Sequence, residues 1–122
     1  MIKSFLLVGL GGGLGSILRY AASLLYKNNT TNFPYSTLFV NAIGCLLIGL
    51  LMGYLERQQV VSNELKLLFI TGFCGGFTTF SAFSSETIFL LQNNQISTAI
   101  LYVFVSLCSG FLLTFLGIIS FK

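Results

Sequence analysis

The residues best suited to bind an ion lie together in residues 72–86, a stretch rich in glycine, threonine and serine. Paired glycines (Gly75, Gly76) are followed by paired threonines (Thr78, Thr79), and both residue types weaken a helix. If the helix breaks there, the bare carbonyl groups would suit a hard cation such as sodium. The alternative is an unbroken, glycine-rich helix crossing whose hydroxyl groups bond back to their own helix. This stretch alone leaves both interpretations open.

Phe80, Phe83 and Glu86 follow at intervals of three residues, which places them on one face of a helix. An aromatic ring has a negative face and a positive edge, so ring edges turned toward a pore could hold a small anion without a fixed cation. Hydroxyl donors stand nearby at Thr79, Ser81, Ser84 and Ser85. Phenylalanines that simply pack or face lipid are the alternative at this point.

Further polar side chains recur at helical spacing in two other apolar stretches. Thr37 and Asn41 are four residues apart and share a face, and so do Tyr102 and Ser106. An asparagine within a membrane span is costly unless it is hydrogen-bonded, so it is a candidate site residue. A hydrogen bond that only joins two helices is the alternative.

Two charged residues, Arg19 and Glu86, are further candidates. Arg19 could extend to the membrane interface or attract anions to a vestibule. We expect Glu86 to pair with a lysine or arginine near an aqueous end of its helix.

The composition places all these residues in a membrane protein. Of the 122 residues, 55% are apolar, 7% are charged, and the mean hydropathy is +0.91. A soluble domain is about a quarter charged. The chain has no histidine or aspartate, which excludes the usual catalytic triads and zinc sites, so we expect no enzyme. Scattered lysines and arginines exclude a nucleic-acid-binding stripe.

Turn-rich breaks at 27–32, 56–64 and 92–95 divide the chain into apolar segments long enough to cross a bilayer. We therefore predict a single all-α transmembrane domain over residues 1–122, with helices at about 4–26, 36–55, 65–91 and 96–120. The third helix is expected to break in mid-membrane. Basic residues favour cytoplasmic termini only weakly, so insertion in both orientations is compatible with the charges.

Glycines recur four residues apart, which predicts close helix packing in lipid. The pairs are Gly9/Gly13, Gly11/Gly15, Gly49/Gly53 and Gly72/Gly76. The glycine run near the N-terminus completes no dinucleotide-binding pattern.

Three segments in order, residues 12–20, 37–44 and 72–83, resemble the motifs of the CrcB/Fluc fluoride channels. The first is similar to the family's G-x-x-R-[YF] motif, the second to T-x-x-x-N-x-x-G, and the third to G-x-x-G-G-x-T-T-F-S-[ST]-F. The resemblance extends from about Gly9 to Gly110. One departure is Ala82, where the family usually has threonine or serine.

This resemblance implies an antiparallel, dual-topology dimer with fluoride pores along its interface. It implies a structural sodium ion, not transported, held at the dimer centre by the backbone carbonyls of Gly75 and Thr78. The pore residues that the resemblance implies are Phe80, Phe83, Asn41, Thr79, Ser81, Thr37, Tyr102, Ser106, Arg19 and Glu86.

The implied function is passive export of fluoride across the bacterial plasma membrane, which lowers cytoplasmic fluoride and its toxicity. The expected partners are fluoride, membrane lipid and a second copy of the chain, or else a homologous chain in a paired channel. Two alternatives remain: a small four-helix proton-coupled drug transporter and a non-conducting partner subunit. The first would require a central carboxylate, whereas Glu86 stands toward one end of its helix.

Overall fold

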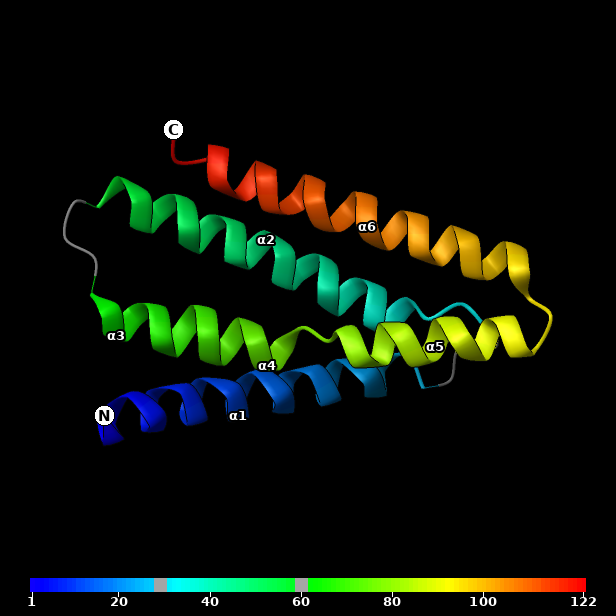
Figure 1. Ribbon diagram of the computed structural model, residues 1–122, viewed down its shortest axis with the longest axis horizontal. Coiled ribbons are helices and arrows are strands. Elements are labelled where there is room, and N and C mark those ends of the chain that lie inside the picture. The colour runs from blue at the N-terminus through cyan, green and yellow to red at the C-terminus, as the bar shows by residue number, and fades with distance from the viewer. Residues whose placement is uncertain (28–30, 59–61) are drawn as a thin grey trace.

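The computed structural model describes residues 1–27, 31–58 and 62–122. Within these ranges the chain is helical and contains no strand, and 4 helices are long and apolar enough to cross a membrane. They are α1 (Ile2–Leu25), α2 (Tyr35–Arg57), a third span (Asn63–Gln92) and α6 (Ile96–Ile119). The N- and C-termini lie at the same end of the bundle (Figure 1). The predicted all-α fold with four spans is confirmed.

Each observed span begins and ends within two residues of its predicted range. A helix of 24 residues, the length of α1, is about 36 Å long, which exceeds a hydrocarbon core of about 30 Å. The predicted breaks at 27–32 and 56–64 fall partly outside the described residues, because 28–30 and 59–61 are not described. The last break is a tight turn in which Asn94 adopts a φ of 58°.

The third span is composed of four consecutive pieces. They are α3 (Asn63–Leu65), the π-helix η1 (Lys66–Cys74), α4 (Gly75–Phe77) and α5 (Phe80–Gln92). Thr78 and Thr79, between α4 and α5, have extended backbone angles. These residues fall within the glycine- and threonine-rich stretch that weakens a helix, whereas nothing in the sequence predicted the π-helix.

Glycines let the backbones of the third span and α1 come into direct contact. A Cβ atom added at Gly15 would lie 2.3 Å from the Phe73 carbonyl oxygen, and one at Gly76 would lie 2.3 Å from the Gly12 carbonyl oxygen. No side chain fits at either position, because the two backbones are already in contact. Close packing by Gly11/Gly15 and Gly72/Gly76 is therefore confirmed, and α1 lies along this part of the third span (Figure 1).

A second glycine contact joins α2 to α6. A Cβ atom at Gly49 would lie 2.3 Å from the Thr114 carbonyl oxygen, and one at Gly53 would lie 2.5 Å from that of Ile118. By contrast, a Cβ atom at Gly9 or Gly13 would meet nothing within 4 Å. The predicted packing of this last pair is wrong among the described residues of this chain.

A cluster of buried side chains lies where α5 meets α6. It consists of Leu90, Ala99 and Tyr102, against which Phe33, Leu38 and Phe83 pack. Other apolar side chains are buried elsewhere in the bundle, namely Val40, Leu55, Cys74 and Phe77. Most other large apolar side chains of the spans face outward. Such a surface is stable in lipid or against another chain, but not in water.

Candidate functional site

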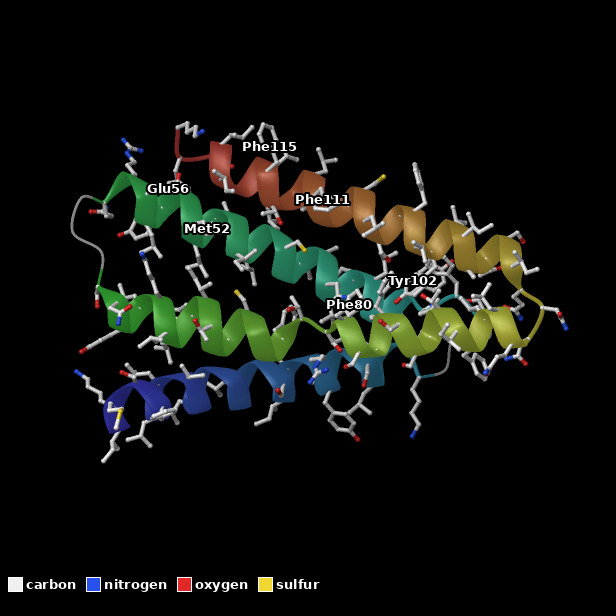
Figure 2. All side chains as sticks on the ribbon, viewed as in Figure 1. Met52, Glu56, Phe80, Tyr102, Phe111 and Phe115 are labelled. Atoms are coloured by element: carbon white, nitrogen blue, oxygen red, sulfur yellow. The ribbon has the colours of Figure 1, made fainter. Side chains whose placement is uncertain are left out.

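A groove of about 760 Å³ runs between α2, the third span and α6. Figure 2 shows Phe80 at the start of α5, and Phe111 and Phe115 on α6, all three of which line the groove. Its polar lining residues are Asn41, Thr71, Thr78, Thr79, Ser106 and Thr114. The groove therefore combines aromatic rings with hydroxyl and amide groups along one side of an open bundle.

The amide of Asn41 pairs with the backbone of Thr79 through two hydrogen bonds. Asn41 Nδ2 donates to the Thr79 carbonyl oxygen at 3.0 Å, and the Thr79 N–H donates to Asn41 Oδ1 at 2.8 Å. This pairing replaces helical hydrogen bonds that the extended backbone of Thr79 cannot make. The asparagine is hydrogen-bonded, as its place in a membrane span requires.

Of the two threonines at the interruption, Thr78 ends α4 and Thr79 begins α5. Thr79 is the N-cap of α5, and its Oγ1 accepts a hydrogen bond from the Ala82 N–H at 3.1 Å. Thr78 Oγ1 donates to the Cys74 carbonyl at 2.8 Å. The methyl group of Thr78 lies over α2, where a Cβ atom at Gly44 would come within 2.1 Å of it. Gly44 therefore makes room for Thr78.

Phe80 and Phe83 face each other at the α5 side of the groove. Their ring centroids are 5.7 Å apart with the planes tilted by 43°, and Phe83 also packs against Tyr102 at 5.3 Å. Phe80 is 78% exposed in the single chain, so it contributes little to the packing of its own subunit. The geometry leaves its ring available to an ion or a partner chain.

Glu86 accepts hydrogen bonds from two hydroxyl groups. Thr37 Oγ1 donates to Oε1 and Tyr102 Oη donates to Oε2, both at 2.7 Å. Among the described residues it forms no ion pair, so the expected pairing with lysine or arginine is wrong. An ion pair elsewhere joins Lys3 to Glu64, near the starts of α1 and of the third span. Buried hydroxyl donors satisfy the carboxylate of Glu86 without a cation.

A second hollow, of about 480 Å³, opens beside Glu86. It is lined by Asn32, Pro34, Ser85, Glu86, Phe89 and Leu90. The carboxylate thus stands between the hydroxyl groups of α2 and α6 and an accessible space at the end of the bundle.

Ser106 differs from the other hydroxyl residues of the groove. Its Oγ is buried and has no hydrogen-bond partner among the described residues. A buried hydroxyl without a partner costs free energy and calls for an explanation, such as an ion or water that it binds.

The structure brings most of the predicted site residues to the groove or to Glu86, but not all of them. Arg19 is half-buried on α1, and none of the described residues that line the two hollows lies on α1. Ser81 is exposed, and its Oγ lies 3.1 Å from Thr79 Oγ1. Phe111 and Phe115 also line the groove and were not among the predicted residues. Their spacing of four residues, which places them on one face of α6, was the available signal.

A cation at the groove would need backbone oxygen ligands. No group of three or more His, Cys, Asp or Glu residues gathers to hold a metal within ranges 1–27, 31–58 and 62–122. Gly75 and Thr78 both line the groove. Gly75 is the first residue of α4 and Thr78 follows its last, so the two stand at opposite ends of this short helix, next to the interruption.

Comparisons with known proteins cover nearly the whole chain. A fluoride-specific ion channel FluC from Flavobacterium psychrophilum is 53% identical over 99% of this chain and 98% of its own length. A protein of the same name from Thermus thermophilus is 48% identical over 95% of this chain and 93% of its own length. A third, from Azobacteroides pseudotrichonymphae, is 42% identical over 98% of this chain and 96% of its own length.

The model of the family described as CrcB-like protein, Camphor Resistance (CrcB), matches residues 6–118. This range includes the groove, the interruption at Thr78 and Thr79, and the hydroxyl groups around Glu86. With four helices able to span a membrane and relatives named as ion channels, the chain is a multi-pass membrane protein. It belongs to the CrcB family.

Proposed function

We propose that this chain forms a fluoride channel that lets fluoride leave the cell passively, which lowers cytoplasmic fluoride and its toxicity. The observation that carries the proposal is the groove, in which Phe80 and Phe83 stand beside hydroxyl groups at an interrupted helix. The relatives named as fluoride-specific ion channels support this choice of ion.

The chemistry of the groove suits a small, strongly hydrated anion. Short donors must replace the water that fluoride loses on entry. The unpartnered hydroxyl of Ser106 is one such donor, and the positive edges of Phe80 and Phe83 supply further favourable contacts. Thr37 and Tyr102 donate their hydroxyl hydrogens to Glu86 and so hold its carboxylate beside the second hollow. Arg19 would act at a distance, by attracting anions to the vestibule.

A sodium ion fits the interrupted helix. In a continuous helix the Gly75 carbonyl would accept from the Thr79 N–H, and the Thr78 carbonyl from the Ala82 N–H. Here both N–H groups donate to side-chain oxygens instead. Carbonyls that have lost their helical donors suit a hard cation. The ion would be structural, and its positive charge would favour an anion in the neighbouring groove.

The open groove supports an assembly of two copies in opposite orientations. Phe111 is 76% exposed and Phe115 is 60% exposed along the groove in the single chain. A two-fold axis would bring the same face of a second copy against them. It would also bring a second pair of Gly75 and Thr78 carbonyls to the sodium ion. We propose that the chain assembles with a second copy of itself. In this assembly the interruption of the third span would lie at the centre of the bilayer.

Passive export requires no energy input beyond the membrane potential. A negative cell interior favours the outward movement of an anion by about 2.3 kcal/mol per 100 mV. The proposed location is therefore the bacterial plasma membrane, where this potential exists.

The proposal is tested in a bacterium that lacks its own fluoride exporter. Expression of the chain is expected to restore growth in medium containing fluoride, whereas the Phe80→Ile variant at equal membrane abundance is expected not to. Phe104, which is 65% exposed on α6 and does not line the groove, supplies the matched control Phe104→Ile. Growth inhibition that is the same with and without the wild-type chain would contradict the proposed function.

A further inference from the structure

Two side-chain oxygens withdraw hydrogen-bond donors from the carbonyl groups at the helix interruption. Asn41 Oδ1 accepts a hydrogen bond from the Thr79 N–H at 2.8 Å, so this N–H does not donate to the Gly75 carbonyl oxygen. Thr79 Oγ1 accepts a hydrogen bond from the Ala82 N–H at 3.1 Å, so this N–H does not donate to the Thr78 carbonyl oxygen. The two carbonyls that lose their donors are the pair proposed to bind sodium.

From this coincidence we infer that Asn41 and Thr79 are positioning residues for the cation site, an inference that rests on the sodium site proposed above. Each accepts a hydrogen bond from an N–H group that, in a continuous helix, would donate to the carbonyl four residues earlier. Neither side chain needs to touch the ion. Each keeps one carbonyl oxygen free for it and fixes the extended backbone between α4 and α5.

Helix α2 supplies the rigid support for this arrangement. The amide of Asn41 holds the Thr79 backbone at both its N–H and its carbonyl. Gly44, three residues later on the same face of α2, provides the space for the Thr78 methyl group. The two consecutive threonines are therefore seated on one helix, which is itself packed against α6 through Gly49.

Asn41 also connects the cation to the groove. Its side-chain nitrogen carries two hydrogens, of which one is donated to the Thr79 carbonyl. The other remains for the groove, which Asn41 lines. The same residue can thus hold the backbone for the cation with its oxygen and offer a donor to an anion with its nitrogen.

Two pairs of variants distinguish the effect of the accepting oxygen from the effect of side-chain packing. Asn41→Leu removes the oxygen at similar size, whereas Asn41→Asp keeps it. Thr79→Val removes the hydroxyl at nearly constant shape, whereas Thr79→Ser keeps it. Phe104→Ile changes an exposed residue of α6 that does not line the groove, and serves as the control.

The measurement is the thermal unfolding midpoint of the purified full-length chain, prepared without sodium salts and titrated with sodium chloride against N-methyl-D-glucamine chloride at constant ionic strength. The wild type and Phe104→Ile are expected to be stabilised by sodium with the same apparent Kd. Asn41→Leu and Thr79→Val are expected to raise that Kd about tenfold, the equivalent of one hydrogen bond. Asn41→Asp and Thr79→Ser are expected to bind sodium within about threefold of the wild type or more tightly.

Equal sodium affinity in the wild type, Asn41→Leu and Thr79→Val would overturn the inference. So would an equal loss in Asn41→Asp and Thr79→Ser, since packing rather than the oxygen would then be responsible. If one variant of a pair does not fold, the other pair decides. A wild type that conducts fluoride without any response to sodium overturns this inference but leaves the channel function intact. A wild type that responds to sodium but conducts no fluoride contradicts the channel function alone.

Discussion

The third span meets α1 along one face and the groove along the other, and the two faces use different residues. Toward α1, Gly72 and Gly76 bring the backbones into direct contact. Toward α2 and α6, the lining is made of aromatic rings and hydroxyl groups around an open space of about 760 Å³. Within the single chain, one face is filled by close backbone contact and the other is open.

This difference distinguishes the residues that hold the third span in place from those that line the proposed ion path. The contact with α1 leaves no room for a side chain, so it holds the span at a constant distance. On the side of α2 and α6, Asn41 bonds to the Thr79 backbone, and the buried side chains of Thr37 and Tyr102 bond to Glu86. Substitutions on the first face should therefore change stability, and substitutions on the second should change ion conduction.

The largest effect is expected on the α1 face. In Gly76→Ala the new Cβ would lie 2.3 Å from the Gly12 carbonyl oxygen, so the two helices must separate. We expect a loss of about 3 kcal/mol in the free energy of unfolding, together with loss of conduction. Thermal unfolding in detergent measures it, and Gly13→Ala, which meets nothing within 4 Å, is the control. Equal unfolding midpoints for Gly76→Ala and the wild type would refute this account of the α1 face.

The second effect belongs to the groove. Phe80→Ile is expected to reduce fluoride efflux from vesicles at least about tenfold, because it removes a positive ring edge from the path. The unfolding midpoint should hardly change, since Phe80 is 78% exposed in the single chain. Phe104→Ile on the outer face of α6 should conduct like the wild type. A Phe80→Ile variant that conducts normally would remove this residue from the path.

A smaller effect is expected at Glu86. Tyr102→Phe and Thr37→Val each remove one hydroxyl donor from its carboxylate. Each is expected to slow fluoride efflux about fivefold, equivalent to about 1 kcal/mol. The double variant should lose less than the product of the two, because both donors hold the same group. Tyr54→Phe at the other end of α2 controls for loss of a hydroxyl, and fully independent effects would contradict a shared role.

The smallest effect concerns Ala82, which stands where the motif that residues 72–83 resemble has threonine or serine. Thr79 Oγ1 and Ser81 Oγ already lie 3.1 Å apart beside this position. Ala82→Thr is therefore expected to raise fluoride efflux only about twofold. Ala82→Val has nearly the shape of threonine without the hydroxyl and is the matched control. An unchanged rate in Ala82→Thr would mean that this position does not contribute to the path.

The spans and the shared faces were predictable from the sequence because they depend on local patterns. Low charge and long apolar segments predicted four helices, and a spacing of four residues placed Thr37 and Asn41 on one face. The partners of those residues depend on how helices from distant parts of the chain pack. Spacing alone therefore did not predict the pairing of Asn41 with the Thr79 backbone.

Glu86 illustrates the same limit. The pattern of charges predicted a lysine or arginine partner, but the packing of α2 and α6 brings two hydroxyl groups to the carboxylate instead. The π-helix η1 likewise has no signal in the local pattern. The groove arises from the arrangement of three separate spans, and no single stretch of sequence contains it.

Fluoride efflux from vesicles that contain only this purified chain tests the central claim most directly. A fluoride electrode would follow the release after a potassium ionophore removes the electrical limit, and a chloride electrode would follow parallel vesicles loaded with chloride. The account predicts rapid fluoride efflux that far exceeds chloride efflux, with no second protein added. Vesicles that retain their fluoride although the chain is folded and inserted would contradict it.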